Sequence, residues 1–266
     1  MRPSTDEVIL DRRGTALWIV LSRPAAFNAI TPASVRGLEA ALAHAESDPT
    51  IRSLVITGSG KAFCAGADLK AVQAAGAGEN ADSATSAFLR AVGSAFHRLE
   101  RLPIPTLAAV NGIALAGGLE LLLCCDLVIA SAEARLGDGH ANFGQIPGGG
   151  GSLRLPRRIG ASRAKHLMFT GASIPAAQAL HWGLVDEVVD PHALAFRVAE
   201  LSEQIAAKSS LVLARMKQLV DDAPHLLPAQ ALEAELRLSD EHMASHDRNE
   251  GLAAFAEKRV PVYLGH

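Results

Sequence analysis

The feature that most restricts the fold of this chain is a change of pattern at about residue 190. Before it, short apolar runs typical of strands alternate with segments of helical periodicity, and after Pro191 the pattern is almost entirely helical. Alternating strands and helices predict an α/β core, and helices without strands predict a separate layer. We expect a core domain over residues 1–190 and a helical C-terminal domain over residues 191–266. Periodicity does not tell whether the core is a doubly wound sheet or a coil of ββα units.

Local signals place the first elements of the core. Residues 7–22 predict a hairpin, with apolar strands on either side of a turn at residues 11–14. Thr31 and Pro32 have the order typical of a helix N-cap followed by the first helical residue. Residues 74–86 are rich in Ala, Gly and Ser, and we expect them to form a mobile loop at the edge of a pocket.

Composition and charge argue against two classes of partner. The formal net charge is −3 and aromatic residues make up only 4% of the chain, so the clustered basic and stacking side chains of a nucleic-acid surface are missing. The longest apolar stretch, residues 119–129, is too short for a membrane span and is interrupted by Glu120 and Asp126. We expect neither nucleic acid nor a membrane as a partner.

The cysteines indicate a reducing compartment. Cys64, Cys124 and Cys125 are odd in number and two of them are adjacent, which argues against a disulfide framework. Their spacing does not fit a zinc site, and the histidines form no metal-binding motif. The first residues also lack the apolar segment of a signal peptide. We therefore expect a cytoplasmic protein without a bound metal.

Two segments carry small residues where a strand gives way to a turn or a helix, namely residues 61–70 and 109–120. Small residues let a ligand approach the backbone closely. In the second segment Gly117 is expected at a helix N-terminus, where its free N–H points outward, and this is the physics of an oxyanion hole. Glu120 follows three residues later. Its local position also fits a capping-box carboxylate, so a structural role stays open.

These segments, together with several others, resemble the enoyl-CoA hydratase/isomerase, or crotonase, family. The resemblance spans nearly the whole chain, and its motifs occur in the family's order: LSRPAAFNA at 21–29, FCAGADL at 63–69, NGIALAGGLE at 111–120, IPGGGG at 146–151 and AFAEKR at 254–259. It implies a crotonase-type ββα superhelix core with a helical C-terminal trimerisation region. Members of this family are usually homotrimers or dimers of trimers.

The resemblance also implies which residues form the site. The family's oxyanion hole matches the backbone N–H groups of Ala67 and Gly117, which would polarise a thioester carbonyl and hold the enolate oxygen. Acyl-CoA is the implied substrate, and no separate cofactor is needed because coenzyme A enters as part of it. The positions that match coenzyme A contacts, the last two often across a subunit boundary, are Ala26, Ala65, Asp68, Leu69, Phe255 and Lys258.

The chain departs from the family pattern at a position that matters for the reaction. A typical hydratase holds one water between two glutamates; the first matches Glu120, but the second falls on His140. Imidazole also exchanges protons near neutral pH, so a Glu–His pair permits acid–base work. Asp138, two residues earlier, could orient His140, and the alternative is that His140 is a packed or solvent-facing loop histidine. A lysine often found near the coenzyme A phosphates is also replaced, by Ala25.

Three functions remain open at this point. Hydration or isomerisation of an enoyl-CoA through an enolate is the first, with Glu120 as main acid–base group and His140 as its partner. The second is a C–C or thioester hydrolase that acts on a β-ketoacyl-CoA. The third is a non-catalytic acyl-CoA-binding homologue, in which Glu120 only caps its helix.

Overall fold

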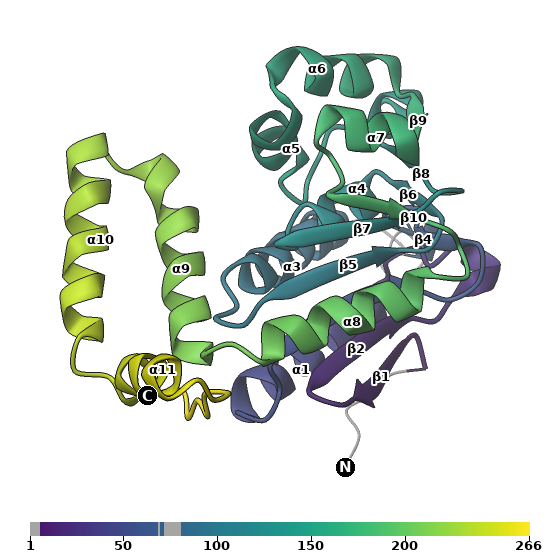
Figure 1. Cartoon of the computed structure of the whole chain (residues 1–266). Helices are drawn as coiled ribbons and strands as arrows, with labels where there is room; N and C mark the ends of the chain where they lie inside the picture. The colour runs from purple at the N-terminus through teal and green to yellow at the C-terminus, as the bar shows by residue number, and fades with distance from the viewer. Residues whose placement is uncertain (1–5, 69, 72–80) are drawn as a thin grey trace.

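The computed structural model describes residues 6–68, 70–71 and 81–266, and its core is built on two sheets (Figure 1). The larger sheet has the strand order β1-β2-β3-β5-β7-β10, and the smaller has the order β4-β6-β8-β9. The larger sheet consists of β1 (Val8–Arg13), β2 (Ala16–Leu21), β3 (Ser53–Gly58), β5 (Thr106–Val110), β7 (Leu127–Ser131) and β10 (Glu187–Val189). The smaller consists of β4 (Ala62–Cys64), β6 (Ile113–Leu115), β8 (Arg135–Gly137) and β9 (Ser173–Pro175).

Consecutive strands alternate between the two sheets. β3, β5 and β7 pair in parallel in the larger sheet, while β4, β6 and β8, which follow them in the chain, pair in parallel in the smaller. Parallel neighbours need a crossover connection, and helices provide it after each pair of strands. The core is therefore a coil of ββα units, which resolves the choice that periodicity left open.

Helices cover both faces of the larger sheet. On one face lie α1 (Pro32–Ser47) and α3 (Ala81–Glu100), within the main apolar core. On the other lies α8 (Leu194–Ala206), whose Leu194 and Val198 pack against Trp18, Val55 and Leu107. Strands buried on both sides read as continuous apolar runs, and this is why β3 and β5 were visible in the sequence. The domain boundary predicted between residues 190 and 191 stays a prediction. The first helix after it, α8, packs against the larger sheet of the core.

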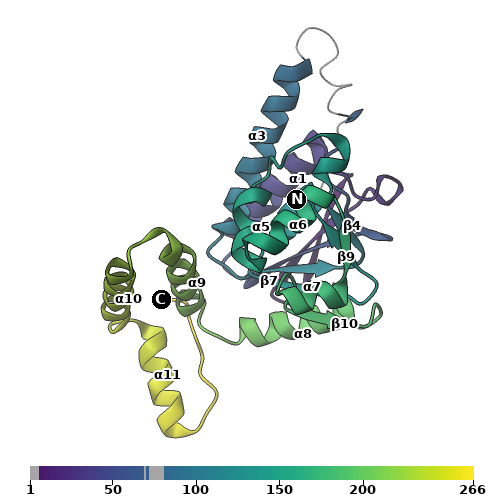
Figure 2. The same cartoon turned by 90° about the horizontal axis from the view of Figure 1, so that it is seen from above.

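The remaining helices lie around the core and beyond it. Three project away from the sheets, with α8 as their connection (Figures 1 and 2). They are α9 (Ser210–Asp222), α10 (Pro228–His242) and α11 (His246–Glu257). Near the smaller sheet lie α4 (Gly117–Leu122), α5 (Gly151–Ile159), α6 (Ala161–Thr170) and α7 (Ala176–Trp182). Short 3-10 helices are η1 (Pro24–Ala26), η2 (His140–Phe143) and η3 (Ala223–His225).

Most local expectations are confirmed, with two corrections. The Thr31 side chain caps α1 by accepting from the N–H groups of Ala33 and Ser34. The hairpin is present, but its turn occupies residues 14–15 and not 11–14, because β1 continues to Arg13 and Gly14 adopts the left-handed φ of 58° that the tight turn needs. The loop expected over residues 74–86 is wrong for its last part, since α3 begins at Ala81 and carries its apolar face onto the core. Residues 72–80 lie outside the described part of the chain.

A buried carboxylate ties the C-terminus to the projecting helices. Asp247 is 2% exposed and accepts hydrogen bonds from the Ser209 hydroxyl, from the N–H groups of Leu264 and Gly265, and from the His246 ring. Burial alone would raise its pKa, but these donors lower the pKa of Asp247 to about 2. The stabilisation is therefore complete above the usual carboxyl pKa of about 4 and is lost as the pH falls toward 2.

We expect Asp247→Asn to lower the free energy of unfolding by about 1–3 kcal/mol at pH 7, because the amide loses acceptor capacity in a buried site. Urea denaturation of the variant and the wild type from pH 7 to pH 3 measures this, and the difference should shrink in the acid range. Asp11→Asn is the control, since Asp11 pairs with Arg13 at the surface. A difference between Asp247→Asn and the wild type that does not change with pH would contradict the role of the ionised carboxylate.

Candidate active site

One cavity collects most of the residues that the sequence singled out. It has a volume of about 450 Å³ and lies between η1, the segment after β4, the start of α4 and the segment that includes η2. Its lining includes Ala26, Ala65, Ala67, Asp68, Gly117, Glu120 and His140. Leu69 lies outside the described residues. Phe255 and Lys258, on and just after α11, are not part of the cavity wall of their own chain, and Phe255 is 86% exposed.

Ala67 and Gly117, the two residues expected to supply backbone amides, both line this cavity. Ala67 forms a parallel bridge with Ile30, in which the carbonyl of Gly66 and the N–H of Asp68 are the groups that bond to Ile30. Because backbone groups alternate along an extended segment, the N–H of Ala67 points to the opposite side. Gly117 is the first residue of α4, so its N–H has no acceptor within the helix. Among the described residues neither N–H has an acceptor.

The two amides are close neighbours. A methyl group placed on Gly117 would lie 3.5 Å from the backbone nitrogen of Ala67, and one placed on Gly66 would lie 3.2 Å from the nitrogen of Gly117. Gly66 has a φ of 103°, a conformation that side chains rarely adopt, so glycine is needed where the chain turns toward α4. The small residues noticed in the sequence thus allow this close approach.

Glu120 enters the cavity from α4 and is almost fully buried. Its Oε1 accepts hydrogen bonds from the N–H groups of Gly149 and Gly151, both at 2.8 Å. Burial raises the pKa of Glu120, although the two N–H donors and His140 work in the opposite direction. The capping-box alternative is wrong, because α4 begins at Gly117 after the N-cap Ala116. The N–H of Ala116 bonds to the Gly137 carbonyl instead.

His140 stands opposite Glu120 and is held from behind by Asp138. Its Nε2 lies 3.9 Å from Oε2 of Glu120, and its Nδ1 lies 3.1 Å from Oδ2 of Asp138. The backbone N–H of His140 donates to Oδ1 of the same aspartate, which is 1% exposed. Gly139 between them has a left-handed φ of 70°, and this turn brings the two side chains together. Burial alone would lower the pKa of His140, but Asp138 and Glu120 raise it above its usual value.

The cavity lining also includes residues that are expected to contact coenzyme A. Asp68 pairs with Arg23 at 3.0 Å, and its pKa is lowered by the N–H of Ala71 and by this arginine. Ala65 donates its N–H to the Phe27 carbonyl, so a ligand could use only its carbonyl. Lys70 also lines the cavity and was not selected from the sequence, where its position two residues after Asp68 was the available signal.

All three cysteines are buried free thiols, and burial raises the pKa of both Cys64 and Cys125 to about 12. Within the described ranges, no group of three or more His, Cys, Asp or Glu side chains could hold a metal ion. Across the same ranges, no helix combines the length and the apolar character needed to cross a membrane.

Comparisons with known proteins agree with this geometry. The profile of the enoyl-CoA hydratase/isomerase family matches residues 11–266. A mitochondrial enoyl-CoA hydratase of Pongo abelii is 36% identical over 95% of this chain and 86% of its own length. A crotonyl-CoA hydratase of Syntrophomonas wolfei is 35% identical over 97% and 98%, respectively. The crystal structure of an enoyl-CoA hydratase from Bacillus anthracis superimposes with a TM-score of 0.92 and 36% identity over 98% of this chain and all of that one. The chain therefore belongs to the enoyl-CoA hydratase/isomerase family.

Proposed function

We propose that this chain is an acyl-CoA enzyme that passes through a thioester enolate, and that its reaction is the hydration or isomerisation of an enoyl-CoA. One observation carries the proposal: Oε2 of Glu120 and Nε2 of His140 lie 3.9 Å apart, and both residues line a cavity that Ala67 and Gly117 also line. Family membership and the hydratases among its relatives support the same reaction class.

The geometry fits the steps of a hydration. The thioester oxygen accepts from the amides of Ala67 and Gly117, which draws electrons from the double bond and stabilises the enolate. One water can bond to both Glu120 and His140, at about 2.8 Å from each, since these groups are close enough to share it. The pair removes a proton from this water as its oxygen adds to Cβ, and returns a proton to Cα. An isomerase would use the same pair to move one proton between carbons.

Coenzyme A is the proposed ligand of the part of the cavity wall formed by Ala26, Ala65 and Asp68, and Leu69 is expected beside them. Phe255 and Lys258 are proposed to reach the site of a neighbouring subunit, because they do not reach their own. In this scheme the thioester and the amide pair carry the chemistry, so we propose that no additional cofactor takes part.

The projecting helices support a homotrimer or a dimer of trimers. Apolar side chains on α9, α10 and α11 are exposed, and a second copy of the chain would cover them. Among them are Met216, Val220, Leu232, Leu236, Leu252 and Phe255. Sedimentation analysis tests this, since a monomer at micromolar concentration would contradict it. The free buried cysteines support a location in the reducing cytoplasm.

The Asp138–His140 pair favours hydrolysis as a second candidate function. A base held by a buried carboxylate is an arrangement that activates water as a nucleophile. With a β-ketoacyl-CoA, the activated water would add to the β-keto carbon, the Cα–Cβ bond would break, and the departing enolate oxygen would sit on the same two amides. Thioester cleavage is the related alternative, with water at the carbonyl carbon. The third reading, binding without catalysis, assumed that Glu120 caps its own helix, whereas Glu120 accepts from Gly149 and Gly151 instead.

A panel of short enoyl-CoA and β-ketoacyl-CoA compounds, with product analysis, separates these reactions. We expect the wild type to form 3-hydroxyacyl-CoA or an enoyl-CoA with a shifted double bond. Free acids as products would support the hydrolase. If no compound of the panel were converted, the proposed enzyme would be contradicted.

His140→Ala should lower kcat by about 10- to 100-fold on the accepted substrate, since one of two acid–base groups is lost. His192→Ala is the control, because His192 is exposed and lies outside the cavity. Equal rates for both variants would make His140 structural.

A further inference from the structure

We propose that Arg154 is a positioning residue that fixes the Glu120 carboxylate through the glycine turn, residues 148–151, which leads into α5. Glu100 anchors Arg154. This inference rests on the proposed function only for its kinetic readout. Arg154 does not line the cavity that holds Glu120 and His140, so it acts through the turn and does not touch substrate.

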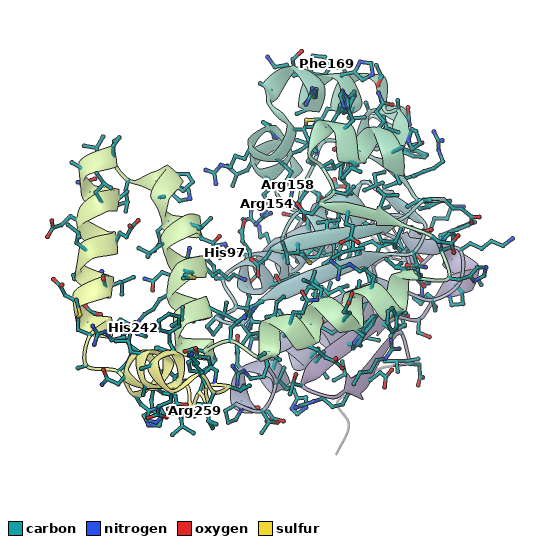
Figure 3. All side chains as sticks on the ribbon, in the orientation of Figure 1. His97, Arg154, Arg158, Phe169, His242 and Arg259 are labelled. Atoms are coloured by element: carbon teal, nitrogen blue, oxygen red, sulfur yellow. The ribbon has the colours of Figure 1, made fainter. Side chains whose placement is uncertain are left out.

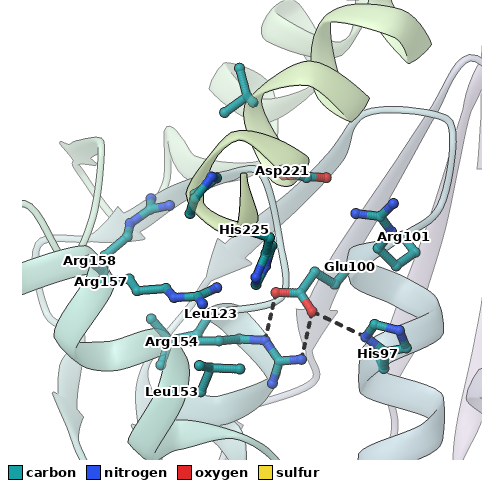
Figure 4. Close-up of a pocket in the computed structure, with 12 residues that line it drawn as sticks. His97, Glu100, Arg101, Leu123, Leu153, Arg154, Arg157, Arg158, Asp221 and His225 are labelled. Carbon is teal, nitrogen blue, oxygen red and sulfur yellow. Dashed lines mark hydrogen bonds and ion pairs between the residues drawn. The ribbon is translucent and has the colours of Figure 1, made fainter. Parts of the chain in front are cut away.

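The guanidinium of Arg154 makes three bonds that together span from α3 to the glycine turn. Its Nε and Nη2 donate to the two carboxylate oxygens of Glu100 at 2.8 and 2.7 Å (Figure 4). Its Nη1 donates to the Gly149 carbonyl at 2.7 Å. Arg154 is only 8% exposed. A two-pronged pair of this kind fixes orientation as well as charge, and a buried guanidinium held on three sides has little freedom.

Gly149 bonds to both Arg154 and Glu120. Gly149 donates its N–H to Oε1 of Glu120 and offers its carbonyl to Arg154, so both of its backbone polar groups are engaged. Gly151 supplies the second N–H to the same oxygen. With Oε1 occupied twice, the carboxylate can turn only Oε2 toward His140. The hydrogen-bond chain therefore runs from Glu100 through Arg154 and Gly149 to Glu120.

The turn needs such an anchor because it consists of four consecutive glycines. A methyl group on Gly149 would lie 2.9 Å from Oε2 of Glu120, and one on Gly150 would lie 2.0 Å from Nη1 of Arg154. Side chains are thus excluded by the carboxylate on one side and by the guanidinium on the other. Glycine has the greatest backbone freedom of all residues, so a turn without side chains has no packing of its own to fix its N–H groups.

Arg154 and Glu100 face a second cavity, of about 340 Å³, which also includes His97, Arg158 and residues of α9 (Figures 3 and 4). Arg158 lies on the same helix as Arg154 but pairs with Asp186 at 2.7 Å and makes no bond to the turn. It is a matched control, because its loss removes one arginine and one ion pair from α5 without loosening Gly149.

We expect Arg154→Met to lower kcat by at least about tenfold and to change KM by less than about threefold, because a small displacement of a catalytic group costs rate while substrate binding is kept. Arg154→Lys should recover little, since one ammonium cannot bond to both Glu100 and Gly149 in this geometry. Arg158→Gln should stay within about twofold of the wild type. Equal losses in Arg154→Met and Arg158→Gln, or a loss confined to KM, would overturn the proposal.

A second readout does not depend on turnover. In protein labelled with 15N-glycine, the amide signals of Gly149 and Gly151 report their bonds to Glu120, and Glu120→Gln identifies them by the shifts it causes. Arg154→Met should move both signals toward positions typical of unbonded amides, whereas Arg158→Gln should leave them in place. Unmoved signals in folded Arg154→Met would overturn the positioning role. If the wild type turns over no acyl-CoA, the proposed function fails while this comparison still decides the role of Arg154.

Discussion

Glu120→Gln is expected to reduce kcat about 1000-fold, in the middle of the range for loss of a general acid–base group. The amide cannot take a proton from water or return one to Cα, and His140 is left without its partner. KM should change little, because Glu120 is assigned to proton transfer, whereas the proposed coenzyme A contacts come from Ala26, Ala65 and Asp68. Steady-state kinetics with the substrate found in the acyl-CoA panel measures both quantities.

The same variant should not be less stable than the wild type at neutral pH. Burial raises the pKa of Glu120, so its contribution to stability is fully present below the ordinary carboxyl pKa and is lost as the pH rises through the raised value. A neutral glutamine avoids this loss, and its carbonyl oxygen can still accept from Gly149 and Gly151. Urea denaturation at pH 5 and pH 8 should therefore show the advantage of the variant growing with pH.

Glu133→Gln is the matched control, because Glu133 is exposed and lies outside the cavity. It should leave kcat within about twofold of the wild type. If Glu120→Gln were as active as this control, Glu120 would have no part in proton transfer. If Glu120→Gln lost both its activity and its cooperative unfolding transition, the Glu120 carboxylate would be required for folding and not for catalysis.

The sequence predicted the architecture well because buried strands and helices have characteristic patterns of apolar residues. Apolar strands such as residues 53–58 and 106–110 had to be buried on both faces, and the helices after Pro191 showed their own period. The start of α3 was missed, since the alanines and serines from residue 81 onward are compatible with a loop as well as a helix. There the tertiary contacts of the apolar face decide, and no local signal reports them.

The sequence predicted the residues that line the candidate site, but it did not predict the residues that hold them in position. The motifs placed Ala67, Gly117 and Glu120 near one another, and the structure brings them to one cavity. The roles of Gly149 and Arg154 were hidden, because a hydrogen bond from one segment's backbone to another segment's carboxylate leaves no periodicity. The capping-box pattern at Glu120 was misleading for the same reason. A capping box and a buried acceptor have similar local sequences and differ only in the partner that the fold supplies.

Ala67→Pro is expected to lower kcat by about 100- to 1000-fold, the loss typical of one oxyanion-hole donor. Proline removes the N–H of residue 67 and places a ring carbon where its hydrogen pointed, so the thioester oxygen loses this donor. That N–H has no acceptor among the described residues, and the bridge to Ile30 uses the neighbouring groups of Gly66 and Asp68. Extended backbone at a bridge is compatible with the φ of proline, and the preceding Gly66 adapts more readily than any other residue.

Ala67→Ser is the control for this change, because it alters the side chain at the same position and keeps the N–H. It should stay within about fivefold of the wild type. Inhibitor binding tests whether residue 67 acts on the enolate oxygen or on the coenzyme A part of the ligand. Ala67→Pro should lose far more affinity for an enolate-like acyl-CoA analogue than for coenzyme A itself. Only the analogue places negative charge on the thioester oxygen. Equal losses for both ligands would show that residue 67 shapes the coenzyme A site. Unchanged kcat in a folded variant would mean that the Gly117 amide alone is sufficient, and the two-donor mechanism would then be wrong.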